Sequence, residues 1–412
     1  MDALIEALRE VIAIDSSDHA GAVQCLHHVL ALAERMGFTT GNMDDRVGWA
    51  EYGEGESLMC VLGHLDVVPA GTGWTRDPFG GEIADGRLYG RGATDDKGPI
   101  LAALFALNEI ARSGELLKRR VRILFGTEEE TGCADMKYYV AHGGELPEVG
   151  FTPDGEFPLI HGEKGLIIEE WACPFPAGMI ESLQGGSAPN IVPESARAVL
   201  RGGTVLECAG VAAHGAEPWN GVNAIGLLME KLDALPLEEP QKTAVHFLHT
   251  RIGTETDGAS LGIAMEDDLS GRLSFNLGQV YTENGELHVV INYRYPVTRS
   301  LADCAPKVEA AFGSAGFRLV RTDREDRLFV PEDSPMVKTL MGVYNSYTGQ
   351  NARPICIGGG TYAKSMPNIV AFGPIFPGDE VTEHRPDEYI SLERLRQNYD
   401  MIKMAISALA NS

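Results

Sequence analysis

The chain has 412 residues, of which 34 are Lys or Arg and 59 are Asp or Glu, and its formal net charge is -25 at pH 7. This acidity argues against DNA, RNA or an anionic membrane surface as the main partner. Apolar residues make up 44% of the chain, enough for a globular core, and the length suggests about two or three domains.

The first residues are predicted to form an amphipathic helix, because the apolar positions 4, 5, 8, 11 and 12 follow a helical period and acidic residues stand at 2, 6 and 10. The basic start and unbroken apolar run of a signal peptide are missing. No stretch reaches the ~18 consecutive apolar residues of a membrane span. The seven cysteines are odd in number and contain no C-x-x-C pair, which is typical of reduced thiols, so we expect a cytoplasmic protein.

Strand-like and helix-like segments alternate through the first 160 residues. Short apolar runs predict strands at 58–66, 120–130 and 148–155, and helical patterns occupy 98–114 and 133–144. This alternation predicts an α/β fold with a mostly parallel sheet covered by helices. In such sheets, functional groups gather at the carboxyl ends of the strands.

The pattern changes from about residue 165. The predicted elements are, in chain order, strands 165–175 and 204–213, helix 223–235, a hairpin over 272–296 that turns at Asn284-Gly285, helix 301–316 and strand 317–323. Their order, β-β-α-β-β-α-β, predicts a small α+β domain inserted into the larger one.

The last segment returns to the α/β style, with predicted helices at 334–349 and 391–409 and short strands between them. We therefore expect the larger domain to comprise 1–164 and 329–412, with the inserted domain at 165–328.

Side chains able to bind a metal ion stand at the predicted strand ends and in loops. They are His64, Asp95, the run Glu128 to Glu130, Asp154 and His384. Taken singly, each has a plainer explanation: a histidine is more often a core or surface residue, a glutamate run is more often a solvated face, and the Asp95-Asp96 pair suits a helix N-terminus. Together, two imidazoles and several carboxylates match the N/O ligand set that zinc prefers. A spare carboxylate beside a ligand carboxylate suits metal-assisted hydrolysis.

Five motifs in this order resemble those of the di-zinc exopeptidases and deacylases. They are GHLDVVPAG, GRLYGRGATDDKG, GTEEETG, PDGEFP and EHRPDE, and the resemblance covers essentially the whole chain. This family includes carboxypeptidase G, succinyl-diaminopimelate desuccinylase, aminoacylase, carnosinase and the PepV-like bacterial dipeptidases, to which RGATDDKGP, PDGEFP and GGGTYA look closest. The resemblance implies a zinc-exopeptidase catalytic domain with an inserted α+β, ferredoxin-like lid domain.

The same resemblance implies two Zn²⁺ ions per chain, with Co²⁺ or Mn²⁺ as substitutes. Asp95 would bridge both ions and precede an unusual cis peptide. His64 and Asp154 would bind one ion, while Glu130 and His384 would bind the other.

Two further carboxylates would serve these ligands. Asp66 would orient the ring of His64, and Glu129 would act as the general base and acid. Three adjacent glutamates allow a slip of one position, but the 35-residue gap from Asp95 to Glu130 matches the spacing of the family.

The inserted domain resembles the family at further positions. His214, in GVAAHGAEPWNGVNA, would polarise the scissile carbonyl and stabilise its oxyanion. Asn190 and Arg294 would hold the terminal carboxylate of the substrate, a role that suits a planar guanidinium. The GGGTYAK stretch lacks the Gly-Lys-Ser/Thr ending of a P-loop and resembles a backbone-lined carboxylate site that runs from Gly359 through Gly360 and Thr361 to Tyr362.

The resemblance predicts a metallo-dipeptidase that hydrolyses dipeptides with a metal-activated water. Two alternatives stay open: an N-acyl or N-succinyl amino acid deacylase of the same fold, and a catalytically silent metal- or peptide-binding relative, against which the carboxylate at 129 argues. The expected partner is a small dipeptide or N-acyl amino acid, with no nucleic acid and no membrane. The lid is shorter than is usual among PepV-like enzymes. Two oligomeric states therefore stay open: a monomer that uses its own His214, and a homodimer in which each chain supplies His214 to the site of its partner.

Overall fold

The computed structural model describes residues 1–412, which form two compact units. The first comprises Met1–His161, Val330–Ile355 and Thr361–Ser412, and the second comprises Gly162–Phe329 with the short segment Cys356–Gly360. The sequence places the inserted domain at 165–328, close to the main part of the second unit. The sequence gives no sign that residues 356–360 belong to the second unit. They do so through long-range hydrogen bonds, which local patterns cannot reveal; for example, the N–H of Lys164 donates to the carbonyl of Ile357 at 3.1 Å.

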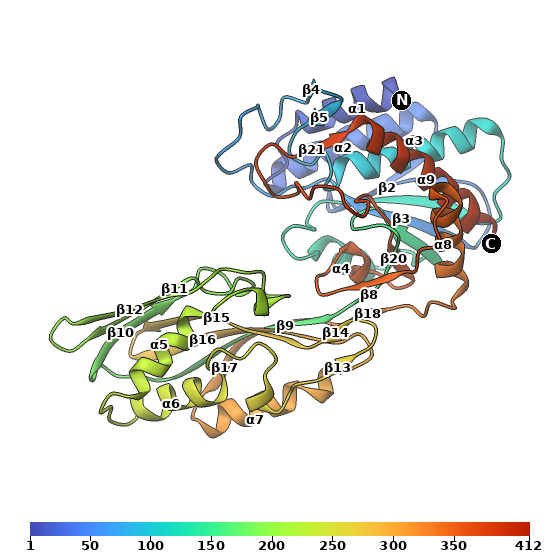
Figure 1. Ribbon diagram of the computed structural model, residues 1–412. Helices are drawn as coiled ribbons and strands as arrows, with labels where there is room; N and C mark the ends of the chain where they lie inside the picture. Colours follow the sequence, from blue (N-terminus) through green and yellow to red (C-terminus); the bar gives the residue numbers. More distant parts are fainter. The chain divides into compact units, whose positions relative to one another are not determined.

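The first unit is built on a mixed sheet with strand order β1-β2-β6-β3-β7-β20-β8 (Figure 1). The central strands β6, β3, β7 and β20 are parallel, and the flanking pairs β1-β2, β2-β6 and β20-β8 are antiparallel. Parallel neighbours present their carboxyl ends at one edge of the sheet. The strands are β1 (Thr39–Met43), β2 (Val47–Tyr52), β3 (Leu58–His64), β6 (Arg120–Gly126), β7 (Val149–Thr152), β8 (Ile160–Glu163) and β20 (Ile369–Ala371).

Helices pack against this sheet and bury its centre. All seven positions of β3 are buried, as expected of a central strand covered on both faces. Asp18 caps α2 by accepting a hydrogen bond from the N–H of Gly21 at 2.8 Å, and Gly37 ends α2 with a φ of 94°. The helices are α1 (Asp2–Ile12), α2 (His19–Met36), α3 (Lys97–Ser113), α4 (Ala134–Ala141), α8 (Pro335–Thr348) and α9 (Leu392–Asn411).

The second unit is an α+β domain on a seven-stranded antiparallel sheet with order β12-β11-β10-β15-β16-β9-β17. The predicted hairpin is present as β15-β16, with φ of 50° at Asn284 and 81° at Gly285 in its turn. The strands are β9 (Gly165–Pro174), β10 (Ile180–Gly185), β11 (Ser195–Leu200), β12 (Val205–Ala209), β15 (Ser274–Glu283), β16 (Glu286–Tyr295) and β17 (Arg318–Glu325).

Three helices pack on this second sheet: α5 (Ala224–Asp233), α6 (Gln241–Arg251) and α7 (Ala305–Ser314). Leu228, Leu248 and Phe312, one from each helix, are fully buried in one apolar cluster with sheet residues such as Ile167 and Ile291. The sheet and the helix layer therefore share a core of their own.

Short elements complete the two units. In the first they are β4 (Glu82–Ala84), β5 (Arg87–Tyr89), β21 (Tyr389–Ser391) and η4 (Tyr362–Ser365), and in the second η1 (Pro218–Asn220), η2 (Ala259–Leu261), η3 (Leu301–Asp303), β13 (Glu266–Asp267), β14 (Gly271–Arg272) and β18 (Leu328–Phe329). The short β19 (Ile355–Ile357) lies where the chain passes from one unit to the other.

The expected fold class, an α/β sheet domain carrying an inserted α+β domain, is confirmed. The elements β10, β11 and α6 were not predicted, so the inserted domain has more strands than expected. These strands are short and alternate weakly, and α6 has a polar first turn, so periodicity alone does not identify them. None of the helices combines the length and apolar character that crossing a membrane requires.

Candidate active site

Three of the predicted ligand positions lie at the carboxyl edge of the parallel strands. His64 is the last residue of β3 and pairs in register with Gly126, the last residue of β6. Glu129 and Glu130 follow β6, and Asp154 follows β7. Since β6, β3 and β7 are parallel neighbours, the fold brings these side chains together.

Two groups of potential ligands meet at Asp95. Its Oδ1 lies 3.0 Å from Nε2 of His64, and its Oδ2 lies 2.9 Å from Nε2 of His384. His64 Nε2 is also 3.9 Å from Asp154, and His384 Nε2 is 3.0 Å from Glu130. In each group, His64-Asp95-Asp154 and Asp95-Glu130-His384, the ligand atoms lie within 4.8 Å of one another.

The loop before α3 presents Asp95 and buries Asp96. The expected cis peptide joins these two residues. Asp96 belongs to neither ligand group, and its Oδ2 accepts a hydrogen bond from the backbone N–H of His64 at 3.2 Å. A Cβ on Gly63 would lie 2.2 Å from that oxygen, so only glycine allows this approach. The two adjacent aspartates therefore have different surroundings and different partners.

Glu388 holds the backbone of the same loop. Its Oε1 accepts hydrogen bonds from the N–H groups of Gly92, Thr94 and Asp95 at 3.1 to 3.3 Å, and its Oε2 pairs with Arg91 at 2.6 Å. Glu388 is fully buried. Glu388 is the last residue of the motif EHRPDE, but the sequence alone indicates no role for it, because its partners lie about 290 residues away in the sequence.

Asp66 supports the residues around His64 in two ways. The Nδ1 atom of His64 lies 3.0 Å from the backbone carbonyl oxygen of Asp66 and 3.4 Å from its carboxylate. The carboxylate accepts hydrogen bonds from the N–H groups of Glu129 at 3.2 Å and Glu130 at 3.0 Å. Asp66 therefore touches the imidazole chiefly through its backbone and fixes the glutamate loop through its side chain.

Charge is crowded in this region of the metal-free protein. Burial and the negative charges of Asp154, Glu130 and Asp95 raise the pKa of Glu129 well above its usual value, although the charge of His64 opposes the rise. Burial and Asp95 raise the pKa of Asp154 to about 7. Hydrogen bonds to Asp95 and Glu130 raise the pKa of His384 to about 11. Carboxylates thus outnumber the cations that could neutralise them.

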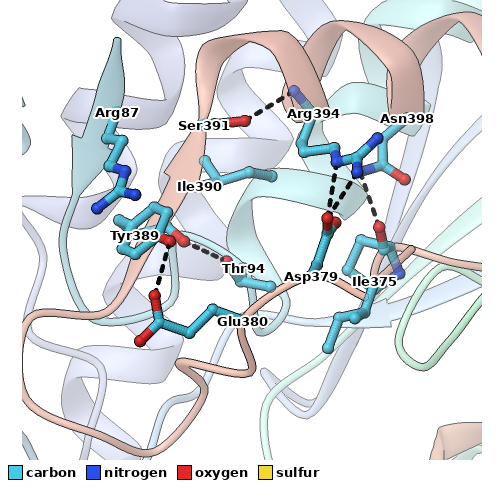
Figure 2. Close-up of a pocket in the computed structure, with 11 residues that line it drawn as sticks. Arg87, Thr94, Ile375, Asp379, Glu380, Tyr389, Ile390, Ser391, Arg394 and Asn398 are labelled. Atoms are coloured by element: carbon cyan, nitrogen blue, oxygen red, sulfur yellow. Dashed lines mark hydrogen bonds and ion pairs between the residues drawn. The ribbon is translucent and has the colours of Figure 1, made fainter. Parts of the chain in front are cut away.

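A separate pocket of about 220 Å³ lies beside the Asp95 loop (Figure 2). Thr94 lines it and donates a hydrogen bond to the carbonyl of Tyr389 at 2.8 Å. Its acidic groups have local partners, since Asp379 lies 2.6 Å from Arg394 and Glu380 accepts a hydrogen bond from the Tyr389 hydroxyl at 3.2 Å. None of the potential metal ligands lines this pocket, so it is distinct from the site described above.

The second unit contains the remaining predicted residues of the inserted domain. The N–H of Ala216 donates to Nδ1 of His214 at 3.3 Å, and burial and the charge of Arg294 lower the pKa of His214. Arg294 is buried, donates to the carbonyl of Gly358 at 2.6 Å and forms no ion pair. Burial lowers its pKa to about 10. Asn190 is exposed, and its backbone carbonyl accepts a hydrogen bond from the N–H of Gly215 at 2.7 Å.

The glycine-rich stretch spans the boundary between the units. Gly359 and Gly360 belong to the second unit, while Thr361 belongs to the first, where its side chain accepts a hydrogen bond from the N–H of Ala363 at 3.2 Å and caps η4.

Comparison with known proteins identifies the family. The sequence matches Peptidase family M20/M25/M40 over residues 60–408. The chain belongs to this family.

Relatives of this M20 peptidase span nearly its whole length. "Putative dipeptidase YtjP" of Bacillus subtilis (strain 168) is 38% identical, over 95% of this chain and 91% of that protein. "Beta-Ala-Xaa dipeptidase" of Lactobacillus delbrueckii subsp. lactis is 31% identical, over 96% of this chain and 93% of that protein. The crystal structure of an M20 family metallo-carboxypeptidase from Sulfolobus solfataricus has the same fold, with a TM-score of 0.66, 17% identity and complete coverage of both chains. The chain is a hydrolase of a metal-dependent peptidase family.

Proposed function

We propose that the chain is a two-metal dipeptidase that hydrolyses dipeptides with a free C-terminal carboxylate. The position of Asp95 carries the proposal, because its two carboxylate oxygens face two separate ligand groups at 3.0 and 2.9 Å. One carboxylate shared by two N/O ligand groups suits a pair of divalent ions.

The donor set fits Zn²⁺, and Co²⁺ or Mn²⁺ would accept the same nitrogen and oxygen ligands. His64 and Asp154 would hold one ion and Glu130 and His384 the other, with Asp95 common to both. The raised pKa values of Glu129 and Asp154 support this assignment, because divalent cations would relieve the crowding of carboxylates. When bound, such ions would lower the pKa of the attacking water and polarise the scissile carbonyl.

Glu129 is the proposed general base and acid. Its carboxylate takes a proton from the water whose oxygen attacks the carbonyl carbon, and returns that proton to the amide nitrogen as the C–N bond breaks. The products are one carboxylic acid and one amine. The Asp66 carboxylate supports this role, because it holds the backbone N–H of Glu129 at 3.2 Å.

His214 is the proposed donor to the oxyanion. Because its Nδ1 accepts a hydrogen bond from Ala216, the neutral ring carries its proton on Nε2, where it can be donated. The lowered pKa of His214 keeps the ring neutral at neutral pH. A neutral imidazole with a fixed tautomer is suited to stabilising developing negative charge.

Arg294 is the proposed partner of the substrate's terminal carboxylate, together with Asn190 and the backbone of Gly359, Gly360 and Thr361. A buried guanidinium without a carboxylate partner is costly unless an anion binds it. Arg294 is such a guanidinium, and the planar arrangement of its N–H donors suits binding of a carboxylate.

A deacylase of N-acyl or N-succinyl amino acids would use the same ligands and the same general base. The names of the two relatives favour the dipeptidase reading. The test is a panel assay of the zinc-loaded protein with free dipeptides, dipeptide amides and N-acyl amino acids. Turnover of free dipeptides well above that of the other two classes supports the proposal, and a preference for N-acyl amino acids overturns it in favour of the deacylase.

A further inference from the structure

Tyr362 is a fully buried residue that touches the ligand groups without belonging to them. It begins η4, and its ring meets the imidazole of His64 edge to face, with ring centres 5.9 Å apart and an interplanar angle of 88°. Its backbone N–H donates a hydrogen bond to the carboxylate of Asp154. Tyr362 therefore contacts both His64 and Asp154, the two potential ligands that form one group with Asp95.

The hydroxyl of Tyr362 reaches a second buried residue, Asp135. It donates to Oδ2 of Asp135 at 2.7 Å. The same oxygen accepts hydrogen bonds from the backbone N–H groups of Thr127 at 2.7 Å and Glu128 at 2.9 Å. Asp135 stands in the first turn of α4 and has no exposed surface. It thus holds the turn that leads directly into Glu129 and Glu130.

The space around this contact admits no larger residue. A Cβ on Gly126, the last residue of β6, would lie 1.8 Å from the Tyr362 hydroxyl and 2.5 Å from Oδ2 of Asp135. Gly126 also accepts the N–H of Leu65 at 2.9 Å, immediately after His64. The end of β6, the start of α4 and η4 are therefore joined at one point.

We propose that Asp135 and Tyr362 form a positioning pair that fixes the ring of His64 relative to the turn that precedes Glu129. Neither side chain is offered as a ligand or a proton carrier. The pair acts because a single hydrogen bond links the residue packed on His64 to the residue that holds the turn before Glu129. Partners of this kind orient metal ligands, and their loss typically lowers metal affinity or activity by about 10–100-fold.

This inference rests on the proposed two-metal hydrolysis, so its test includes measurements that need no substrate. Tyr362→Phe keeps the ring against His64 and removes only the hydroxyl. Tyr344→Phe is the matched control, since Tyr344 is equally buried in the first unit and packs on Phe157 in the apolar core. The readouts are the Zn²⁺ dissociation constant by chelator competition, the visible spectrum of the Co²⁺-loaded protein, and kcat and KM for a dipeptide.

We expect Tyr362→Phe to weaken Zn²⁺ binding or lower kcat by about 10–100-fold, to change the Co²⁺ spectrum and to leave KM unchanged. Tyr344→Phe should show none of these effects, because its ring packs on Phe157 in the apolar core of the first unit. Asp135→Asn should reproduce the losses, and the double variant should lose less than the sum of the two, because both changes break one contact.

The proposal fails if Tyr362→Phe matches Tyr344→Phe in metal affinity, spectrum and kcat, or if only KM changes. If Asp135→Asn does not fold, Tyr362→Phe alone decides the outcome. If no dipeptide is hydrolysed by the unaltered protein, the metal affinity and the Co²⁺ spectrum still test the pair, so the two proposals fail separately.

Discussion

The carboxylate of Asp66 accepts a hydrogen bond from the backbone N–H of Glu130 at 3.0 Å. The other oxygen of the same carboxylate accepts the N–H of Glu129 at 3.2 Å. A residue two positions after His64 thus fixes the backbone of the proposed general base and of a proposed ligand. This link between β3 and the end of β6 underlies the first prediction.

Asp66→Asn should lower kcat/KM by about 10–100-fold and weaken Zn²⁺ binding, because the asparagine NH₂ group would face one of the two N–H donors. Steady-state kinetics and chelator competition measure the two effects. Asp18→Asn is the control, since Asp18 also accepts a backbone N–H but asparagine caps helices equally well. An Asp66→Asn variant with unaltered kinetics would contradict the supporting role.

Glu129→Gln should retain its metal ions and lose about 10²–10⁴-fold in kcat, because glutamine keeps the shape but cannot accept the proton of water. Elemental analysis and kcat measure the two properties. Glu128→Gln is the control, because Glu128 pairs with Arg46 at 2.8 Å and is not a proposed participant. A large loss in Glu128→Gln with near-normal Glu129→Gln would move the general base by one position.

The zinc-loaded protein should contain two ions per chain, and Asp95→Ala should contain one or none, since both ligand groups use Asp95. Elemental analysis after removal of loosely bound zinc gives the stoichiometry. If the unaltered protein contained one zinc ion per chain and the Asp95→Ala variant contained the same number, a carboxylate shared by two ions would be ruled out.

Metal binding should release protons and strengthen as pH rises. In the metal-free protein the pKa of His384 is raised to about 11, so its ring is protonated at neutral pH, and hydrogen bonds to Asp66 and Asp95 shift the pKa of His64 in the same direction against the effect of burial. An imidazole must be neutral to bind a metal ion, so binding displaces these protons. Calorimetry in buffers of different ionisation enthalpy measures the release, and the Zn²⁺ affinity should increase from about pH 6 to about pH 8. An affinity that is constant with pH would contradict histidine ligation.

Arg294→Ala should sharply depress kcat/KM for free dipeptides, because a charge-assisted contact to the substrate carboxylate is lost. Amidation of the substrate C-terminus should have a similar effect, and the two losses should not add, because they remove the same contact. Arg318→Ala is the control, since Arg318 forms only an exposed ion pair with Glu286. If dipeptide amides were cleaved as fast as free dipeptides, the proposed contact of Arg294 with the substrate carboxylate and the exopeptidase specificity would both be contradicted.

Much of the fold could be predicted because it follows local patterns. The apolar run of β3, the helix over 97–113 and the Asn284-Gly285 turn all have strong signals of period or turn type. The strands β10 and β11 escaped prediction because they are short and owe their conformation to pairing within the sheet, and the helix α6 escaped it because its first turn is polar.

The sequence by itself determined a set of candidate residues, because chemical type at the predicted strand ends marks His64 and Asp95 as possible ligands, and the resemblance of the motifs to a known family singles out Glu129. Only the tertiary structure decided how the set is supported. Glu388 lies some 290 residues from the amides it holds, and Tyr362 lies 227 residues from Asp135. Such partners are invisible to local patterns, because a buried carboxylate or hydroxyl finds its hydrogen bonds wherever the folded chain places the donors and acceptors.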